Sequence, residues 1–370
     1  MYFCLVHISI FSHLNLFKVA MQTRKYLSRL CFISGLFFLA SCTNDAQIPS
    51  KMVSFEDAFQ LQRKIYLDEE IKLTGISSLL FDKNGNILLL DFVSKQVILV
   101  TKEGKLIKNI SPDTCHPGHD WSPFAANFNK SGNILVLTKI GQIYWFSHTG
   151  ECIVKGKTLS AGPNNKLAFD ATGNFYFKEQ TPTETYVHKS DSLGTKTSRF
   201  KIDDPFPIRN GFSISTPIDT DGEYLLIVQK YFDGFYVYDQ YGKKLKTVKF
   251  ESPNFKAPKE DIDTRNTKEL IKESGKYSVV LNLFKTNFGS VSLNFHRFNL
   301  SKKRIGINIY DQKNNILRYV LSDNRAWLEG KDQNDFFYTT FNPSKEDLAA
   351  CKQCGAKTTW GLNVYQLKNE

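Results

Sequence analysis

Two short segments of this chain concentrate side chains that could bind a metal ion or transfer a proton. Residues 115–120 read Cys-His-Pro-Gly-His-Asp, so a thiol, two imidazoles and a carboxylate lie within six positions. Residues 351–354 read Cys-Lys-Gln-Cys. Thiolates and imidazoles are the ligands that tetrahedral zinc prefers, although this spacing matches no zinc-finger pattern. The candidate metal ligands are Cys115, His119, Cys351 and Cys354.

A second group of residues could bind an organic ligand. Arginine can clamp a carboxylate, aromatic rings can stack on a sugar, and histidine can serve as a general base or a ligand contact. No nucleophile elbow, Gly-rich phosphate loop or paired-carboxylate motif accompanies them, so no catalytic residue is assigned. The binding candidates are His116, His119, Asp120, Trp121, Arg209, Tyr231, Asp233 and Arg325.

Four blocks of similar sequence lie between residues 81 and 242. Each block has polar turn formers, a glycine, an apolar run, and a second glycine 18–21 residues after the first. Because glycine adopts a positive φ at little cost, each glycine predicts a hairpin turn and each block predicts four strands. A period in the forties with four strands is typical of a β-propeller blade. The first glycines are Gly85, Gly132, Gly173 and Gly222, and the second ones are Gly104, Gly150, Gly194 and Gly242.

Two less regular blocks follow, and they bring the predicted number of blades to six. Residues 277–321 read as four strands, and the last block runs from residue 325 to a strand at 362–367, without an outer strand. We expect residues 60–67 to supply that strand and close the ring, because closure removes an exposed sheet edge. Helical composition is confined to residues 54–63 and 259–274. The sequence predicts an all-β, six-bladed propeller with four-stranded antiparallel blades, the last closed by an N-terminal strand.

The two faces of such a ring have different loops. The first and third turns of each blade lie on one face, which we call the bottom face. The second turn and the link to the next blade lie on the other, the top face. The loops that contain residues 115–120 and 351–354 are both predicted on the top face, in the first and last blades, which are neighbours in a closed ring.

The N-terminal segment resembles the signal peptide of bacterial lipoproteins. Basic residues precede an apolar run at 30–40, and Leu39-Ala40-Ser41-Cys42 matches the lipobox. The run has 11 residues, whereas a membrane-spanning helix needs about 20. The resemblance implies that Cys42 is acylated after removal of residues 1–41, of which 1–20 are not translated if synthesis starts at Met21. We expect residues 42–58 to be a lipidated linker and residues 59–370 to form the propeller.

The first blade resembles the NHL repeat in residues 82–87, Asp91 and Gln96-Val97. The whole mature chain resembles bacterial lipoproteins with a six-bladed β-propeller of NHL/TolB-like type. This resemblance implies a lipid-anchored protein of the cell envelope. Thr43 after the acylated cysteine favours the outer membrane, on its periplasmic side or at the cell surface.

Four cysteines remain after Cys42 in that oxidising compartment, where cysteines pair. We expect a Cys351–Cys354 disulfide. A Cys115–Cys152 disulfide is disfavoured, because a strand separates the two faces by about 17–20 Å, beyond disulfide reach.

Charge limits the choice of partners. The formal net charge of +11 falls to +7 when the four basic residues before Cys42 are removed. The basic residues are spread along the sequence, which argues against nucleic acid as a partner. The sequence predicts a membrane-anchored binding module, without a cofactor, whose top face recognises a protein, a peptide or a glycan. The alternative is a metal-dependent, lactonase- or lyase-like propeller enzyme that uses His116, His119, Asp120 and the 351–354 loop.

Overall fold

The chain consists of two compact units, Met1–Ile48 and Pro49–Glu370. The first unit lies outside the residues that the computed structural model describes, and everything below concerns the second unit. The described residues are 52–114, 117, 121–159, 166–181, 184–203, 217–221, 223–258, 275–296, 304–322, 327–351 and 358–368.

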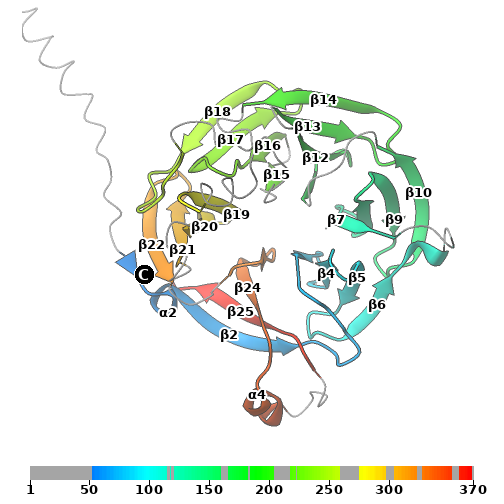
Figure 1. The fold of residues 1–370 in the computed structure, drawn as a ribbon, viewed down its shortest axis with the longest axis horizontal. Helices are drawn as coiled ribbons and strands as arrows, with labels where there is room; N and C mark the ends of the chain where they lie inside the picture. The colour runs from blue at the N-terminus through cyan, green and yellow to red at the C-terminus, as the bar shows by residue number, and fades with distance from the viewer. Residues whose placement is uncertain are drawn as a thin grey trace, which may run out of the picture. The chain divides into compact units, whose positions relative to one another are not determined.

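Six antiparallel sheets, the blades, surround a common centre (Figure 1). Blade 1 contains β3 (Ser78–Phe81), β4 (Ile87–Asp91), β5 (Gln96–Val100) and β6 (Leu106–Ile110). Blade 2 contains β7 (Pro123–Phe128), β8 (Ile134–Thr138), β9 (Gln142–Phe146) and β10 (Cys152–Thr158). Blade 3 contains β11 (Leu167–Phe169), β12 (Phe175–Gln180), β13 (Thr185–Ser190) and β14 (Thr197–Ile202). Blade 4 contains β15 (Ile218–Asp221), β16 (Tyr224–Ile227), β17 (Gly234–Asp239) and β18 (Lys244–Lys249). Blade 5 contains β19 (Ser278–Thr286), β20 (Gly289–His296), β21 (Arg304–Asp311) and β22 (Ile316–Ser322). Blade 6 contains β23 (Gly330–Lys331), β24 (Phe336–Phe341), β25 (Gly361–Leu367) and β2 (Phe59–Tyr66).

The N-terminal strand β2 completes the last blade, which confirms the predicted ring closure. It pairs antiparallel with β25, from Phe59 opposite Leu367 to Tyr66 opposite Gly361. The molecule is therefore a six-bladed β-propeller, as predicted from the repeats.

The segment expected to be a linker is structured from residue 52 onwards, which corrects its predicted boundary. β1 (Met52–Val53) pairs in parallel with β22 and adds a fifth strand to blade 5. The short helix α2 (Phe55–Ala58) follows, with Ser54 accepting a hydrogen bond from the backbone N–H of Asp57. Phe55 and Ala58 are buried in the core between blades 5 and 6. Because pairing with β25 takes over at Phe59, the helical composition of residues 54–63 yields only one turn of helix.

Two further helical segments lie within the described residues. The 3₁₀ helix η1 (Pro112–Thr114) follows blade 1, and α4 (Lys345–Ala350) precedes the last strand. The α4 helix begins with a capping box between Ser344 and Asp347, a sequence signal that could have predicted it. The helix expected at 259–274 lies outside the described residues. In the described part of the chain, no helix has the length and apolar character needed to span a membrane.

The core consists of six apolar clusters between neighbouring blades. Leu88 and Leu90 of β4, for example, pack with Ile134 and Val136 of β8 in the next blade. Because both faces of each blade are covered, the middle strands β4, β8 and β9 are apolar except for one polar residue at an end of each, and all of their residues are buried. This pattern explains why these strands lack the alternation of a half-exposed sheet.

Basic side chains concentrate on the fourth strand of each blade, counted outward from the channel, a clustering that the sequence did not indicate. These six strands together contain eleven Lys or Arg residues and no Asp or Glu; they are β2, β6, β10, β14, β18 and β22. Charged side chains, lysine above all, protect an unpaired strand edge from pairing with another chain. The excess positive charge therefore has a structural explanation on the rim of the ring.

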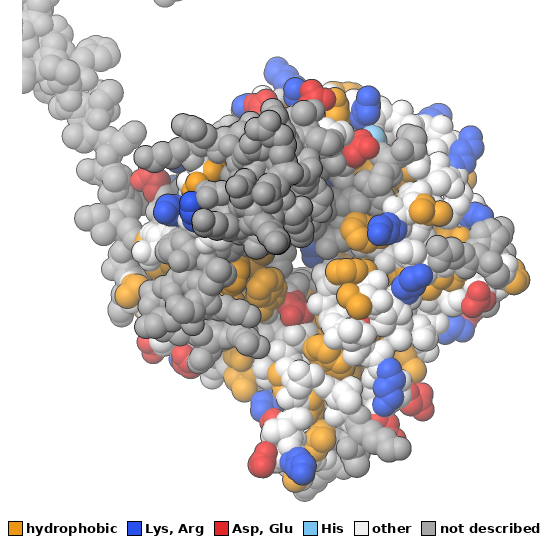
Figure 2. All heavy atoms as spheres, viewed as in Figure 1, with side chains coloured by type: hydrophobic (Ala, Val, Ile, Leu, Met, Phe, Trp, Pro, Cys, Tyr) orange, Lys and Arg blue, Asp and Glu red, His pale blue; other side chains and the backbone are white. Residues whose placement is uncertain are grey.

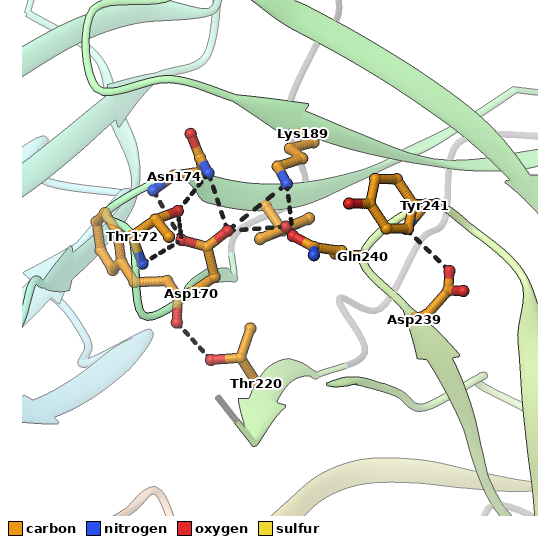
Figure 3. A network of polar contacts seen from close by, with 10 residues as sticks. Asp170, Thr172, Asn174, Lys189, Thr220, Asp239, Gln240 and Tyr241 are labelled. Atoms are coloured by element: carbon orange, nitrogen blue, oxygen red, sulfur yellow. Dashed lines mark hydrogen bonds and ion pairs between the residues drawn. The ribbon is translucent and has the colours of Figure 1, made fainter. Parts of the chain in front are cut away.

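The aspartates of the repeats cap hairpin turns (Figure 3). Asp170 Oδ1 accepts hydrogen bonds from the backbone N–H groups of Thr172 and Asn174 at 2.9 and 3.0 Å, and Oδ2 accepts one from the Tyr176 hydroxyl at 3.0 Å. Burial alone would raise the pKa of Asp170, but these bonds hold it below its usual range. Lys189 lies 3.7 Å from Asp170 Oδ2 and donates to Gln240 of the next blade. Equivalent caps are formed by Asp82, Asp311 and Asp332.

Candidate functional site

The innermost strands of three blades bring polar side chains to the top mouth of the central channel. Ser78 begins β3, Lys166 immediately precedes β11, and Glu329 immediately precedes β23. Figure 2 shows an opening at the centre of the ring with an acidic side chain on its edge. Residues far apart in the sequence therefore converge on the axis of the propeller.

Lys166 and Glu329 are oppositely charged groups at this mouth. The Lys166 ammonium donates a hydrogen bond to Ser78 Oγ at 3.0 Å, which links blade 3 to blade 1. Glu329 Oε1 accepts one from the Thr340 hydroxyl at 2.7 Å, whereas Oε2 is buried and has no partner among the described residues. We call Ser78, Lys166, Glu329 and Thr340 the channel site.

The surroundings shift both ionisable groups toward neutrality. Burial lowers the pKa of Lys166 to about 8, against an opposing attraction from Glu329. Burial raises the pKa of Glu329 to about 7, although the Thr340 hydrogen bond and Lys166 act in the other direction. Each charge is thus incompletely compensated by the residues around it.

An apolar patch lies beside the channel on the top-face turns of blades 1 and 2. Phe92 and Val93, in the β4–β5 turn, are 43% and 61% exposed, and Ile140, in the β8–β9 turn, is 63% exposed. The Phe124 ring lies 6.1 Å from the Phe92 ring. The Phe92 N–H contacts Ser77 Oγ at 3.4 Å, one residue before Ser78 of the channel site. We call Phe92, Val93, Phe124 and Ile140 the top-face patch.

Hydrogen bonds hold one turn of this patch in place. Asp91 Oδ1 accepts from the N–H groups of Val93 and Ser94 at 2.9 and 3.0 Å. Its Oδ2 accepts from Thr74 and Gly75. Burial opposes ionisation, but the hydrogen bonds keep the pKa of Asp91 below its usual range. Phe92 and Val93 are therefore presented on a fixed turn.

Three of the binding residues predicted from the sequence lie within the described part of the chain, and each makes contacts inside the fold. Trp121 packs edge-on against Tyr144, with ring centroids 5.7 Å apart. Tyr231 is 3% exposed and belongs to the core between blades 5 and 6. Asp233 accepts hydrogen bonds from Ser252 N and Oγ at 2.7 and 2.6 Å, and burial raises its pKa to about 6 despite these bonds. Little surface of Tyr231 is available to a ligand.

The remaining site predictions fall on residues outside the described ranges. In the described ranges, no group of three His, Cys, Asp or Glu side chains could hold a metal ion. The residues concerned are Cys42, Cys115, His116, His119, Asp120, Arg209, Arg325 and Cys354.

Cys152 and Cys351 are each in a disulfide. The end of β6 and the turn before Cys152 lie closer together than a separation by the length of a strand would allow. Gly150, in that turn, lies so close to the end of β6 that a Cβ on it would be 3.2 Å from Ile110 Cγ1. The reason is the twist of the blades, whose outer strands run along the circumference of the ring (Figure 1).

A buried Ser–His pair in blade 5 was not found from the sequence. Ser278 Oγ lies 2.9 Å from His296 Nδ1, and His296 Nε2 lies 3.2 Å from the Tyr319 hydroxyl. Ser278 and His296 are at most 1% exposed, and Ser278 Oγ also accepts from the backbone N–H of Lys256. A nucleophile must reach its substrate, so this enclosed arrangement serves packing between blades 4 and 5.

Two cavities that described residues line lie away from the top mouth. A groove of about 820 Å³ on the rim is lined by charges of both signs, of which Lys105 and Asp68 pair at 3.1 Å. A cavity of about 300 Å³ at the bottom mouth of the channel is lined by Phe81, Phe128 and Phe169. Each of these rings also packs against the core between two blades, which accounts for its position.

Sequence reasoning missed Lys166 and Glu329. Each is a charged residue immediately before the first strand of a blade, and in a propeller that position faces the central channel. Blade boundaries read from the glycine turns could have indicated both residues. Their convergence could not be predicted, because it depends on which blades face each other across the ring.

Comparison with known proteins supports the architecture. No family model and no curated protein matches this chain. Among solved structures, it is similar to a protein of Bacteroides fragilis described as exported, at 12% identity with a TM-score of 0.66, over 86% of this chain and 98% of the other. It is also similar to a DUF4221 family member from Bacteroides vulgatus, at 14% identity with a TM-score of 0.60, over 85% of this chain and 99% of the other. At these identities the likeness shows the fold, and the site must be argued from this chain's own residues.

Proposed function

We propose that this protein is a lipid-anchored binding module of the cell envelope, which recognises a protein or peptide through its top-face patch. The observation that carries the proposal is the exposure of Phe92, Val93 and Ile140 on the top-face turns of two neighbouring blades, with Phe124 beside Phe92. Single exposed apolar residues are common on protein surfaces, whereas contiguous patches mark interaction sites.

The chemistry of the patch favours a protein or peptide. Two aromatic rings and two aliphatic side chains offer apolar area with few polar groups, as at the centre of protein interfaces. The turn that presents Phe92 and Val93 is held by Asp91, so little conformational freedom is lost on binding. No observation on the described residues favours the metal-dependent enzyme.

The patch is tested by comparing captured partners. We expect wild-type protein, immobilised and incubated with envelope extract, to enrich a partner that the Phe92→Ser/Ile140→Ser variant captures at least tenfold less well. Quantitative mass spectrometry measures the enrichment. The control variant Ile153→Ser/Leu245→Ser changes two apolar residues on the rim that are 52% and 45% exposed, and it should capture as wild type does. Equal capture by all three proteins would exclude the patch as the binding site.

The anchor rests on the lipobox and has its own test. We expect the mature protein to begin at Cys42 with a mass increase for its acyl chains, because one chain binds a membrane only weakly and stable anchoring needs more than one. Cys42→Ala should abolish the mass increase and move the protein to the aqueous phase in detergent partitioning. Cys31→Ala, a change within the apolar run, should leave both unchanged. An unmodified N-terminus upstream of residue 42 would contradict the anchor.

A further inference from the structure

We propose that the channel site binds a small zwitterion, a molecule with one ammonium and one carboxylate group, as in a free α-amino acid. The proposal is separate from partner binding at the top-face patch. It rests on the way in which blades 3 and 6 present opposite charges across the central axis.

The hydrogen-bonding capacity of the two charged groups is incompletely used. The Lys166 ammonium has three N–H donors, and Ser78 Oγ accepts one of them at 3.0 Å. Glu329 uses Oε1 to accept from Thr340, while Oε2 is enclosed without a partner in the described part of the chain. Lys166 and Glu329 attract each other but form no direct ion pair. The site is therefore an open pair, with donors on one side and an acceptor on the other.

Leaving a buried acceptor without a hydrogen bond is unfavourable, the more so when the group is charged, so such a site favours a ligand that completes it. A carboxylate fits the free donors of Lys166, and an ammonium fits Oε2 of Glu329. A simple anion or cation would complete only one of the two. A neutral polyol could bond to both but would neutralise neither charge. A zwitterion alone satisfies both charges and leaves the site with no change in net charge.

The position of the site suits a small ligand. Ser78 is 3% exposed, and Ser78 and Thr340 fix the two charged side chains by one hydrogen bond each. Figure 2 shows an opening at the centre of the ring, and a ligand that enters it reaches the buried Oε2 once the Glu329 side chain turns toward the channel. Because the two charges come from different blades of a closed ring, the fold sets the spacing between them.

Isothermal titration calorimetry on the mature protein tests the charge requirement with L-alanine as the probe. N-acetyl-L-alanine lacks the ammonium and L-alaninamide lacks the carboxylate. We expect L-alanine to bind and each analogue to bind at least tenfold more weakly. Equal binding of L-alanine and either analogue, binding of a neutral polyol such as glucose with similar affinity, or no binding of L-alanine at millimolar concentration would overturn the proposal.

Variants separate recognition from a structural role. Lys166→Met should weaken L-alanine binding at least tenfold and leave L-alaninamide unaffected, whereas Glu329→Gln should weaken L-alanine and leave N-acetyl-L-alanine unaffected. Glu329→Gln can still accept the hydrogen bond from Thr340, and thermal unfolding verifies that both variants fold.

Lys246→Met and Glu251→Gln are controls that remove exposed charges outside the channel site. Phe92→Ser/Ile140→Ser should bind L-alanine normally, so failure of the patch and failure of the channel site can be distinguished. Equal losses for all ligands in both variants would indicate a structural role and contradict the proposal.

Discussion

A chain that begins at residue 68 is expected to lose its cooperative folding, because it lacks β1, α2 and β2. The missing segment supplies the outer strand of blade 6, including Phe59 and Ile65, which are 2% and 4% exposed. Burying a large apolar side chain contributes about 1.5–3 kcal/mol, so loss of Phe55, Phe59 and Ile65 removes roughly 5–9 kcal/mol. This is of the same order as the whole stability of a typical domain.

The effect extends beyond blade 6, because β2 closes the ring. Its removal leaves β25 as an unpaired edge and separates the two ends of the circle. Urea unfolding followed by tryptophan fluorescence measures the result, since Trp145 lies in blade 2 and Trp360 precedes β25 in blade 6. A chain that begins at residue 49 keeps the whole second unit and is the control. If the shorter chain unfolded with the same midpoint and slope as this control, the closure would have no energetic role.

The architecture was predictable because turn chemistry is local. A hairpin that needs a positive φ selects glycine wherever the chain places it, as at Gly85 with φ 83°. Asn314 has φ 66° at the equivalent turn of blade 5, and asparagine is among the residues that best tolerate this conformation. The period of these turns fixes the number of blades without knowledge of any long-range contact. The missing outer strand of the last blade then pointed to its N-terminal replacement.

Features that depend on how strands lie in space were not predictable in the same way. The two residues of β1 carry too little pattern to indicate pairing with β22, which depends on the position of that edge beside α2. The twist that brings Ile110 next to Gly150 comes from the packing of whole blades. The channel site combines residues from blades 1, 3 and 6, and no spacing in the sequence encodes that combination.

The pH dependence of stability should reveal the channel site, and Glu329 is the group to follow. Its pKa is about 7 in the folded protein and 4.5 in the unfolded chain, so the folded state holds an additional proton between these values. The unfolding free energy must then fall as the pH rises from 4.5 to 7. The shift corresponds to about 3 kcal/mol at ~1.4 kcal/mol per pH unit.

Glu329→Gln removes this contribution, so stability of wild type relative to the variant should decline by about 3 kcal/mol across that range and change little above pH 7. Urea unfolding at a series of pH values measures the difference, in which the other titrating groups largely cancel. Thr340→Val removes a hydrogen bond that favours the carboxylate, so the decline should extend to higher pH.

The contribution of Lys166 to stability changes with pH in the opposite direction. The pKa of Lys166 is about 8 in the folded protein and 10.5 in the unfolded chain, so its contribution to stability rises between those values. The unfolding free energy of wild type, measured relative to that of a Glu329→Gln/Lys166→Met double variant, should therefore have a local minimum near pH 7–8. Parallel curves for wild type and Glu329→Gln would mean that Glu329 is fully compensated in the folded state, and the open charge pair would not exist.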